Sequence, residues 1–95
     1  MRFRAELYRY NGDAAWYFLT VPLKVAEPLS DSIVGPRRGF GSIKVRVSVG
    51  ETTWSTSVFP QKDGTYVLPV KKAVRTAEAL EDGELVSVEL EPATP

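Results

Sequence analysis

The segment best suited to chemistry is residues 36–42, which reads Pro-Arg-Arg-Gly-Phe-Gly-Ser. Two adjacent arginines offer planar, charge-assisted hydrogen-bond donors, and glycines let backbone amides approach an anion closely. The Gly-Lys-Ser/Thr ending of a Walker-type phosphate-binding loop is absent. The segment therefore predicts a site for a small anion, close to an aromatic strand and a further lysine. The candidate ligand-binding residues are Arg37, Arg38, Phe40, Ser42, Trp54 and Lys62.

A structural explanation of the same segment stays open. In that explanation Gly39 and Gly41 serve the geometry of turns, and the ring of Phe40 fills part of the core. The two arginines are then solvated, or bonded to acidic residues elsewhere in the chain. Only the binding hypothesis requires the guanidinium groups to face a ligand.

Aromatic side chains are numerous for so short a chain and form a second candidate feature. Some of them would line a groove and stack on a base or a small ring, or all of them would supply buried area to a small core. Core packing is the commoner use of such residues. The side chains concerned are Trp16, Tyr17, Trp54, Phe59 and Tyr66.

The chain contains no histidine and no cysteine. Their absence removes the commonest general base, the commonest metal ligand and the Ser-His and Cys-His nucleophile pairs. Residues 55–57 carry hydroxyls, but a catalytic Ser-Lys pair with Lys62 or Lys71 is supported only by nearness in sequence. The acidic turn at residues 81–84 is at most a weak divalent-cation site, and such turns are common. We therefore expect a protein that is not an enzyme and uses no metal or cofactor.

The charges balance over the chain but not along it. Twelve basic and twelve acidic residues give a formal net charge of 0, which disfavours a strongly basic nucleic-acid binder. Residues 1–47 carry eight basic and four acidic residues, and residues 48–95 carry four basic and eight acidic ones. If the two halves interleave, these charges pair internally. If they separate, one face attracts an anion or a phosphate backbone.

The 95 residues fit one domain, which we expect to be a barrel over residues 1–91 with a frayed tail at residues 92–95. No apolar run approaches the roughly 20 residues that span a bilayer. The N-terminus lacks a signal-peptide core. We therefore expect a cytoplasmic protein with no membrane partner.

Hydrophobic periodicity predicts a mainly β fold. Alternating or β-branched runs indicate six strands, at residues 2–10, 15–21, 43–49, 52–59, 65–68 and 86–91. Three short segments between them are typical of hairpin turns: Asn11-Gly12, Gly50-Glu51 and Lys62-Asp63-Gly64.

Two apolar stripes predict short helices at residues 23–34 and 70–80. Pro28 should kink or break the first helix, because it cannot donate a backbone hydrogen bond. Pro69 lies just ahead of the second helix, where it can serve as the first helical residue. The expected buried stripe of that helix is Val70, Ala73, Val74, Ala77 and Leu80, and its expected wet side is Lys71, Lys72, Arg75 and Glu78.

Two segments of the chain follow one plan. Residues 17–26 and 66–73 each contain an apolar strand, a proline, a lysine two residues later and an alanine two further on. Each then continues as a helix and returns as a strand. Such a unit cannot bury its apolar face alone, so we expect two units to pair around a pseudo-two-fold axis and close one core.

Several blocks resemble domain-of-unknown-function family 1905 of bacteria and archaea. They are Arg38–Ile43, Trp54–Pro60, Gly64–Arg75 and Leu80–Glu91. The resemblance covers nearly the whole chain and implies a double-split β-barrel, similar to the swapped-hairpin dimers of AbrB-like regulators and MazE-like antitoxins but with both halves in one chain. The family has no established activity, so the resemblance implies no catalytic residue.

Taken together, the residues and the resemblance predict a mainly β, pseudo-two-fold double-split barrel of about six strands and two short helices. We expect a bacterial, non-enzymatic binding or accessory module that takes an anionic small ligand at residues 37–42, or a protein partner. The alternative is a nucleic-acid-binding regulator, by analogy with AbrB-like folds. We expect a monomer or a weak dimer.

Overall fold

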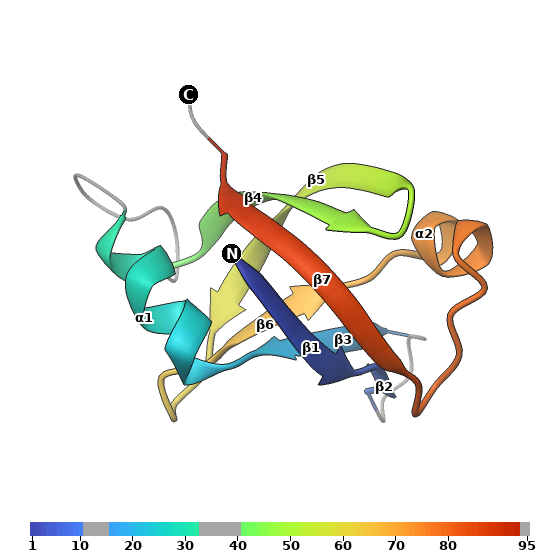
Figure 1. Cartoon of the computed structure of the whole chain (residues 1–95). Helices are drawn as coiled ribbons and strands as arrows, with labels where there is room; N and C mark the ends of the chain where they lie inside the picture. Colours follow the sequence, from blue (N-terminus) through green and yellow to red (C-terminus); the bar gives the residue numbers. More distant parts are fainter. Residues whose placement is uncertain (11–15, 33–40, 94–95) are drawn as a thin grey trace.

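The computed structural model describes residues 1–10, 16–32 and 41–93. Over these residues the chain forms a strand-rich barrel with one helix on each of two opposite sides (Figure 1). The strands are β1 (Arg2–Glu6), β2 (Tyr8–Arg9), β3 (Tyr17–Val21), β4 (Ile43–Val49), β5 (Thr52–Pro60), β6 (Tyr66–Pro69) and β7 (Leu85–Pro92). The helices are α1 (Leu23–Asp31) and α2 (Lys72–Ala77). The predicted mainly β fold with two short helices is confirmed.

The strands form one antiparallel sheet in the order β1-β7-β4-β5-β6-β3-β2. Because β2 follows β1 directly in the chain, this order begins and ends in the same segment, and the sheet curls round almost to closure. The interior is filled by buried apolar side chains alone among the described residues. Closure leaves few free strand edges, which is how antiparallel barrels avoid edge-to-edge association.

The predicted strand at residues 2–10 divides into β1 and β2 at Leu7, so the barrel has seven strands and not six. The Leu7 amide donates to the carbonyl of Glu84 at 2.9 Å, and its carbonyl accepts from the Gly83 amide at 2.7 Å. These bonds to a distant turn take Leu7 out of the strand ladder. Its side chain is fully buried, as the alternation of residues 2–10 predicts.

Of the kink or break predicted at Pro28, the break is wrong, because α1 continues through this residue. Pro28 and the residue four positions earlier, Lys24, are both exposed. Pro28 has no amide hydrogen to donate to the Lys24 carbonyl, and water can solvate that carbonyl instead. Val25 and Leu29 of the predicted stripe are buried. The predicted end at residues 33–34 lies outside the described residues. No described helix is long and apolar enough to cross a bilayer.

The predicted start of the second helix is also wrong. Pro69 ends β6 opposite Phe18, and α2 begins three residues later with Lys71 as its N-cap. The Val70 amide donates to the Tyr17 carbonyl at 2.9 Å, which keeps the chain extended past Pro69. Hydrogen-bonded and non-hydrogen-bonded pairs alternate in an antiparallel ladder, so the Pro69 nitrogen points away from β3 and no bond to β3 is lost.

Only part of the predicted α2 stripe is buried. Val70 and Val74 lie in the core, whereas Ala73 and Ala77 are exposed. Arg75, expected on the wet side, is half-buried. A helix this short has room for only one turn of contact with the barrel.

The two strand–helix units pair as predicted. β3 and β6 pair with Leu19 opposite Leu68, and the neighbouring pairs Phe18–Pro69 and Thr20–Val67 exchange under a two-fold rotation about that point. β4 and β7 pair in the same way about Val47 and Leu90. The residues at these two centres are all fully buried: Leu19, Val47, Leu68 and Leu90. The pseudo-two-fold axis therefore runs through the middle of the core.

The helix starts obey the same symmetry. The N-cap residue Pro22 has φ −70° and ψ 160°, and the N-cap residue Lys71 has φ −69° and ψ 158°. Each N-cap carbonyl accepts from the amides three and four residues later. Pro22 is thus equivalent to Lys71, not to Pro69, and the repeated proline–lysine–alanine pattern of the sequence is out of step with the structural repeat by two residues.

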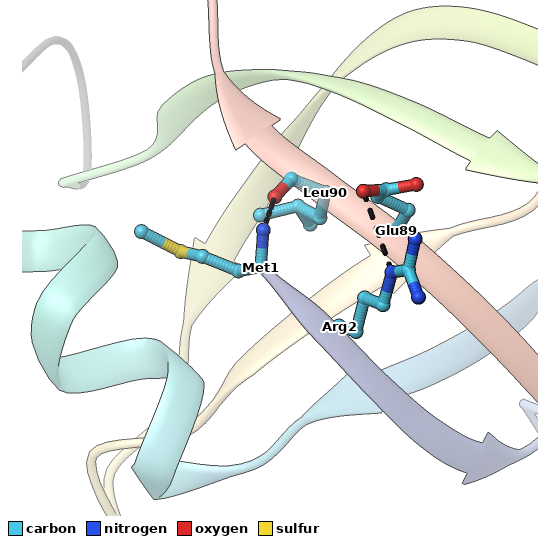
Figure 2. A network of polar contacts seen from close by, with 4 residues as sticks. All are labelled: Met1, Arg2, Glu89 and Leu90. Atoms are coloured by element: carbon cyan, nitrogen blue, oxygen red, sulfur yellow. Dashed lines mark hydrogen bonds and ion pairs between the residues drawn. The ribbon is translucent and has the colours of Figure 1, made fainter.

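The chain's charged halves interleave. β7 lies between β1 and β4, so its acidic side chains stand beside basic ones of the first half. The Arg2 Nε atom lies 3.5 Å from the Glu89 carboxylate, and the Met1 amino group donates to the Leu90 carbonyl at 2.8 Å. Figure 2 shows the two contacts side by side. Both charged side chains of this pair are mostly exposed, so it contributes little to stability.

The barrel extends beyond the boundary expected at residue 91. Pro92 is the last residue of β7 and lies opposite Val45. The Ala93 amide then donates to the Lys44 carbonyl at 2.9 Å. Residues 94–95 of the expected tail lie outside the described residues.

Replacing Gly50 with alanine should lower the free energy of unfolding by about 1–3 kcal/mol. Gly50 opens the predicted Gly50-Glu51 turn with φ 58°, and an added Cβ would overlap the Glu78 carboxylate. That carboxylate accepts a 2.6 Å hydrogen bond from the Thr52 hydroxyl. Gly83→Ala is the control, because φ is 87° there but a Cβ meets nothing within 4 Å. Urea denaturation measures both variants, and equal losses would contradict the role given to Glu78.

Candidate functional site

One opening in the barrel wall lies where β5 and β6 diverge. β5 pairs with β4 from Thr52 to Val58, but it pairs with β6 only through Phe59 and Pro60. Two adjoining hollows of about 550 and 510 Å³ occupy the gap and share part of their lining. We call the two together the split groove. Its described lining comprises Trp16, Tyr17, Lys44, Val45, Trp54, Ser55, Thr56, Ser57, Phe59, Pro69, Val70, Lys71, Lys72, Arg75 and Ala93.

Aromatic rings form much of the split groove. Trp16 is 54% exposed and stacks on Phe18, with ring centroids 6.2 Å apart and 5° between the ring planes. Trp54 is only 8% exposed and belongs to the core as well as to the lining. Trp16 therefore offers a free aromatic surface, whereas Trp54 is largely covered.

Arg75 is fixed in the wall of the split groove. Its guanidinium carbon lies 3.9 Å from the centre of the Tyr17 ring, and its Nε atom donates to the Val70 carbonyl at 3.2 Å. A guanidinium over an aromatic face is a favourable cation–π contact. These two contacts hold the side chain, so little conformational entropy remains to be lost when it meets a ligand.

All the charged residues in the described lining are cationic. They are Lys44, Lys71, Lys72 and Arg75. None of them forms an ion pair with another described residue. Cations gathered without carboxylates beside an apolar surface raise the local concentration of anions.

Two of the predicted site residues, Ser42 and Trp54, lie apart along the β4–β5 hairpin. Arg37, Arg38 and Phe40 lie outside the described residues. Ser42 is half-buried just before β4. Trp54 pairs with Val47, five residues further along that strand, or roughly 17 Å away at the usual rise per residue. Trp54 lines the split groove.

The aromatic candidates divide between the two uses considered from sequence. Trp16, Tyr17, Trp54 and Phe59 line the split groove, and Tyr66 is buried. Sequence reasoning did not place the four cations in a site. Three of them were recognisable as the polar side of the second predicted helix, but nothing local indicated that this side faces a gap between strands.

The remaining candidates from sequence show no catalytic or metal-binding geometry among the described residues. Ser55 and Lys71 line the same groove without a hydrogen bond between them. In the acidic turn, the Asp82 carboxylate accepts from the Arg9 amide at 3.1 Å and the Glu84 carboxylate accepts from the Glu81 amide at 3.2 Å. No cluster of three potential ligands suited to a metal ion occurs in residues 1–10, 16–32 and 41–93.

Lys62 lies in an exposed turn that is organised by its neighbour Asp63. The Thr65 hydroxyl donates to the Asp63 carboxylate at 2.6 Å, and the Thr65 amide donates to the same oxygen at 2.9 Å. The first bond, aided by the second, lowers the pKa of Asp63 below its ordinary value. These bonds shape the hairpin. Lys62 does not line the split groove.

The fold and the groove together define a small, pseudo-symmetric β-barrel with an opening between two of its strands. Residues 3–90 match the profile of the domain of unknown function DUF1905, and the chain belongs to this family. The resemblance noted in the sequence is thereby confirmed at the level of the family. No curated protein matches the chain.

Replacing Thr65 with valine should raise the pKa of Asp63 toward its ordinary value without fully restoring it, because the Thr65 amide still donates. A carboxylate whose pKa is lowered by folding stabilises the fold above its unfolded pKa, and this stabilisation is lost as the pH falls through the lowered value. An NMR titration of the Asp63 carboxyl carbon measures the shift. Thr52→Val, at a distant hydroxyl, is the control. An unchanged pKa in Thr65→Val would contradict the assignment.

Proposed function

We propose that the protein is a non-enzymatic binding module whose split groove takes an anionic ligand that also carries a flat or apolar group. The observation that carries this proposal is the composition of the groove. Four cations and no carboxylate stand in its described lining beside the exposed ring of Trp16. A ligand with both features gains from charge and from stacking at once.

The size of the groove suits such a ligand. Each of its two hollows, of about 550 and 510 Å³, is within the range of small-molecule sites, which is roughly 300–1,000 Å³. The proposal moves the expected anion site from residues 37–42 to the gap between β5 and β6. We also propose that the protein is bacterial and cytoplasmic, and that it is a monomer or a weak dimer, as expected from the sequence.

Binding of adenosine monophosphate, adenosine and ribose 5-phosphate should separate the two contributions. We expect the nucleotide to bind best, because only it combines the ring with the anion. The double variant Lys71→Ala/Lys72→Ala should weaken nucleotide binding by about tenfold, which corresponds to about 1.4 kcal/mol. Calorimetry gives the affinities, and Trp16 fluorescence reports stacking in a Trp54→Phe background.

Two further variants serve as controls for that experiment. Arg2→Ala/Arg4→Ala removes the same charge from β1, outside the split groove, and should leave binding almost unchanged. Arg37→Ala/Arg38→Ala tests the loop predicted from sequence. If either of these pairs reduces binding as much as Lys71→Ala/Lys72→Ala does, the split groove is not the site.

The second candidate function is binding of single-stranded nucleic acid. A cationic groove with exposed aromatic rings is the usual platform for stacked bases. The AbrB-like fold expected from the sequence would imply the same class. The net charge of 0 weighs against it. Affinity for a short oligothymidylate that falls steeply with salt concentration would favour this function over small-ligand binding.

A further inference from the structure

Four aromatic side chains gather on the outer side of β2 and β3, next to the split groove. Tyr8 pairs with Phe18, and this register places Tyr10 opposite Trp16, whose carbonyl accepts from the Tyr10 amide at 2.8 Å. Directly opposite residues of an antiparallel pair share a face of the sheet. Phe18 points away from the core, because its neighbour Leu19 points into it. We call Tyr8, Tyr10, Trp16 and Phe18 the aromatic face.

The rings of the aromatic face contact one another and stay open to solvent. The centre of the Phe18 ring lies 5.9 Å from that of Tyr8, and 6.2 Å from those of Tyr10 and Trp16. Tyr10 is 56% exposed and Trp16 is 54% exposed. Phe18 therefore supports two neighbouring rings whose surfaces are more than half free.

The aromatic face continues the split groove. Trp16 belongs to both, and Pro69 of the groove lining lies opposite Phe18. The groove supplies four cations, and the aromatic face supplies none. In a cross-strand pair such as Tyr10 and Trp16 the two Cβ atoms are about 5 Å apart. A ligand that extends from the groove across Trp16 therefore meets Tyr10 next.

Two exposed rings in succession beside a group of cations suit a ligand that repeats a ring and an anion along its length. Each nucleotide of a single strand brings one base and one phosphate, and successive bases stack on exposed aromatic side chains. Neighbouring bases are about 3.4 Å apart when they stack on one another in a duplex, and single strands can splay them farther apart. The spacing of Trp16 and Tyr10 is therefore within reach of neighbouring bases.

We infer that the split groove binds a single-stranded oligonucleotide of at least two nucleotides, with one base on Trp16 and the next on Tyr10. This inference rests on the proposed binding function and names its ligand class. The phosphates face the cations of the groove, and the second base lies on the aromatic face. Tyr10 is then a specificity-determining residue, because a mononucleotide has no second base to place on it.

Calorimetry with adenosine monophosphate and with the 5′-phosphorylated dinucleotide of adenosine tests the inference. We expect the dinucleotide to bind about five- to hundredfold more tightly, which is the usual gain from one further stacked base. Tyr10→Leu should remove most of this gain and leave the affinity for the mononucleotide unchanged, because leucine is apolar but has no ring. Tyr10→Phe is the matched control and should bind both ligands as the parent does. Trp16→Leu should weaken the binding of both.

NMR of the parent protein gives a second readout that needs no variant. A base stacked on an aromatic side chain shifts the proton resonances of that ring upfield through its ring current. The dinucleotide should shift the ring protons of both Trp16 and Tyr10, whereas the mononucleotide should shift only those of Trp16. Shifts confined to Trp16 with both ligands would contradict the inference.

The outcomes separate this inference from the proposed function. If adenosine monophosphate binds and the dinucleotide binds no more tightly, or if Tyr10→Leu leaves the gain intact, the inference is wrong and the binding function stands. If sedimentation shows a dimer that Tyr10→Leu dissociates, and the dinucleotide has no advantage, the aromatic face joins two copies of the chain and the inference is also wrong. If neither nucleotide binds, both proposals fail.

Discussion

The contact between Leu19 and Leu68 organises this barrel. These residues face one another at the centre of the β3–β6 ladder, and both are fully buried. Each belongs to a strand that leads into a helix through an extended N-cap residue, Pro22 or Lys71. Because neither unit can cover its own apolar face, the pairing of the two strands is what allows one core to form. The Val47–Leu90 pair completes the arrangement on the opposite wall.

The same pairing produces the split groove. β5 lies between β4 and β6 and pairs with both. It pairs with β4 from Thr52 to Val58 but with β6 through only two residue pairs, so β5 and β6 diverge beyond those pairs. The pseudo-two-fold axis relates this place to the edge of β1, where β1 pairs with β7 as β5 pairs with β4. Ser55 and Ser57 occupy the positions that Arg2 and Arg4 occupy on the other side. The symmetry of the backbone does not extend fully to chemistry: Glu89 stands among the cations of the hollow beside β1, whereas the described lining of the split groove holds no carboxylate.

Local sequence rules were sufficient wherever a residue's structure depends on its near neighbours. The alternation in residues 43–49, the Gly50 turn and the buried positions Val25 and Leu29 follow from periodicity and turn chemistry. These local rules failed where a hydrogen bond to a distant residue determines the backbone structure. Leu7 leaves its strand because of the turn at residues 83–84, and Val70 stays extended because of Tyr17. Both contacts join residues that only the finished barrel brings together.

The groove was beyond sequence reasoning for the same reason. The rings of Trp16 and Trp54 and the cations of α2 come from separate segments, and their meeting depends on where β5 diverges from β6. The internal repeat was detectable, but its proline–lysine–alanine pattern suggested the wrong equivalence, because Pro69 is retained in a strand. Conformation at the N-caps, not residue type, carries the symmetry.

The most direct test of this architecture is NMR measurement of scalar couplings across backbone hydrogen bonds. The Val70 amide bonds to the Tyr17 carbonyl, so the alternation of the ladder makes Leu19 and Leu68 a reciprocally bonded pair. We predict couplings from the Leu19 amide to the Leu68 carbonyl and from the Leu68 amide to the Leu19 carbonyl. Couplings that instead join Phe18 or Thr20 to β6, or none between β3 and β6, would contradict the account.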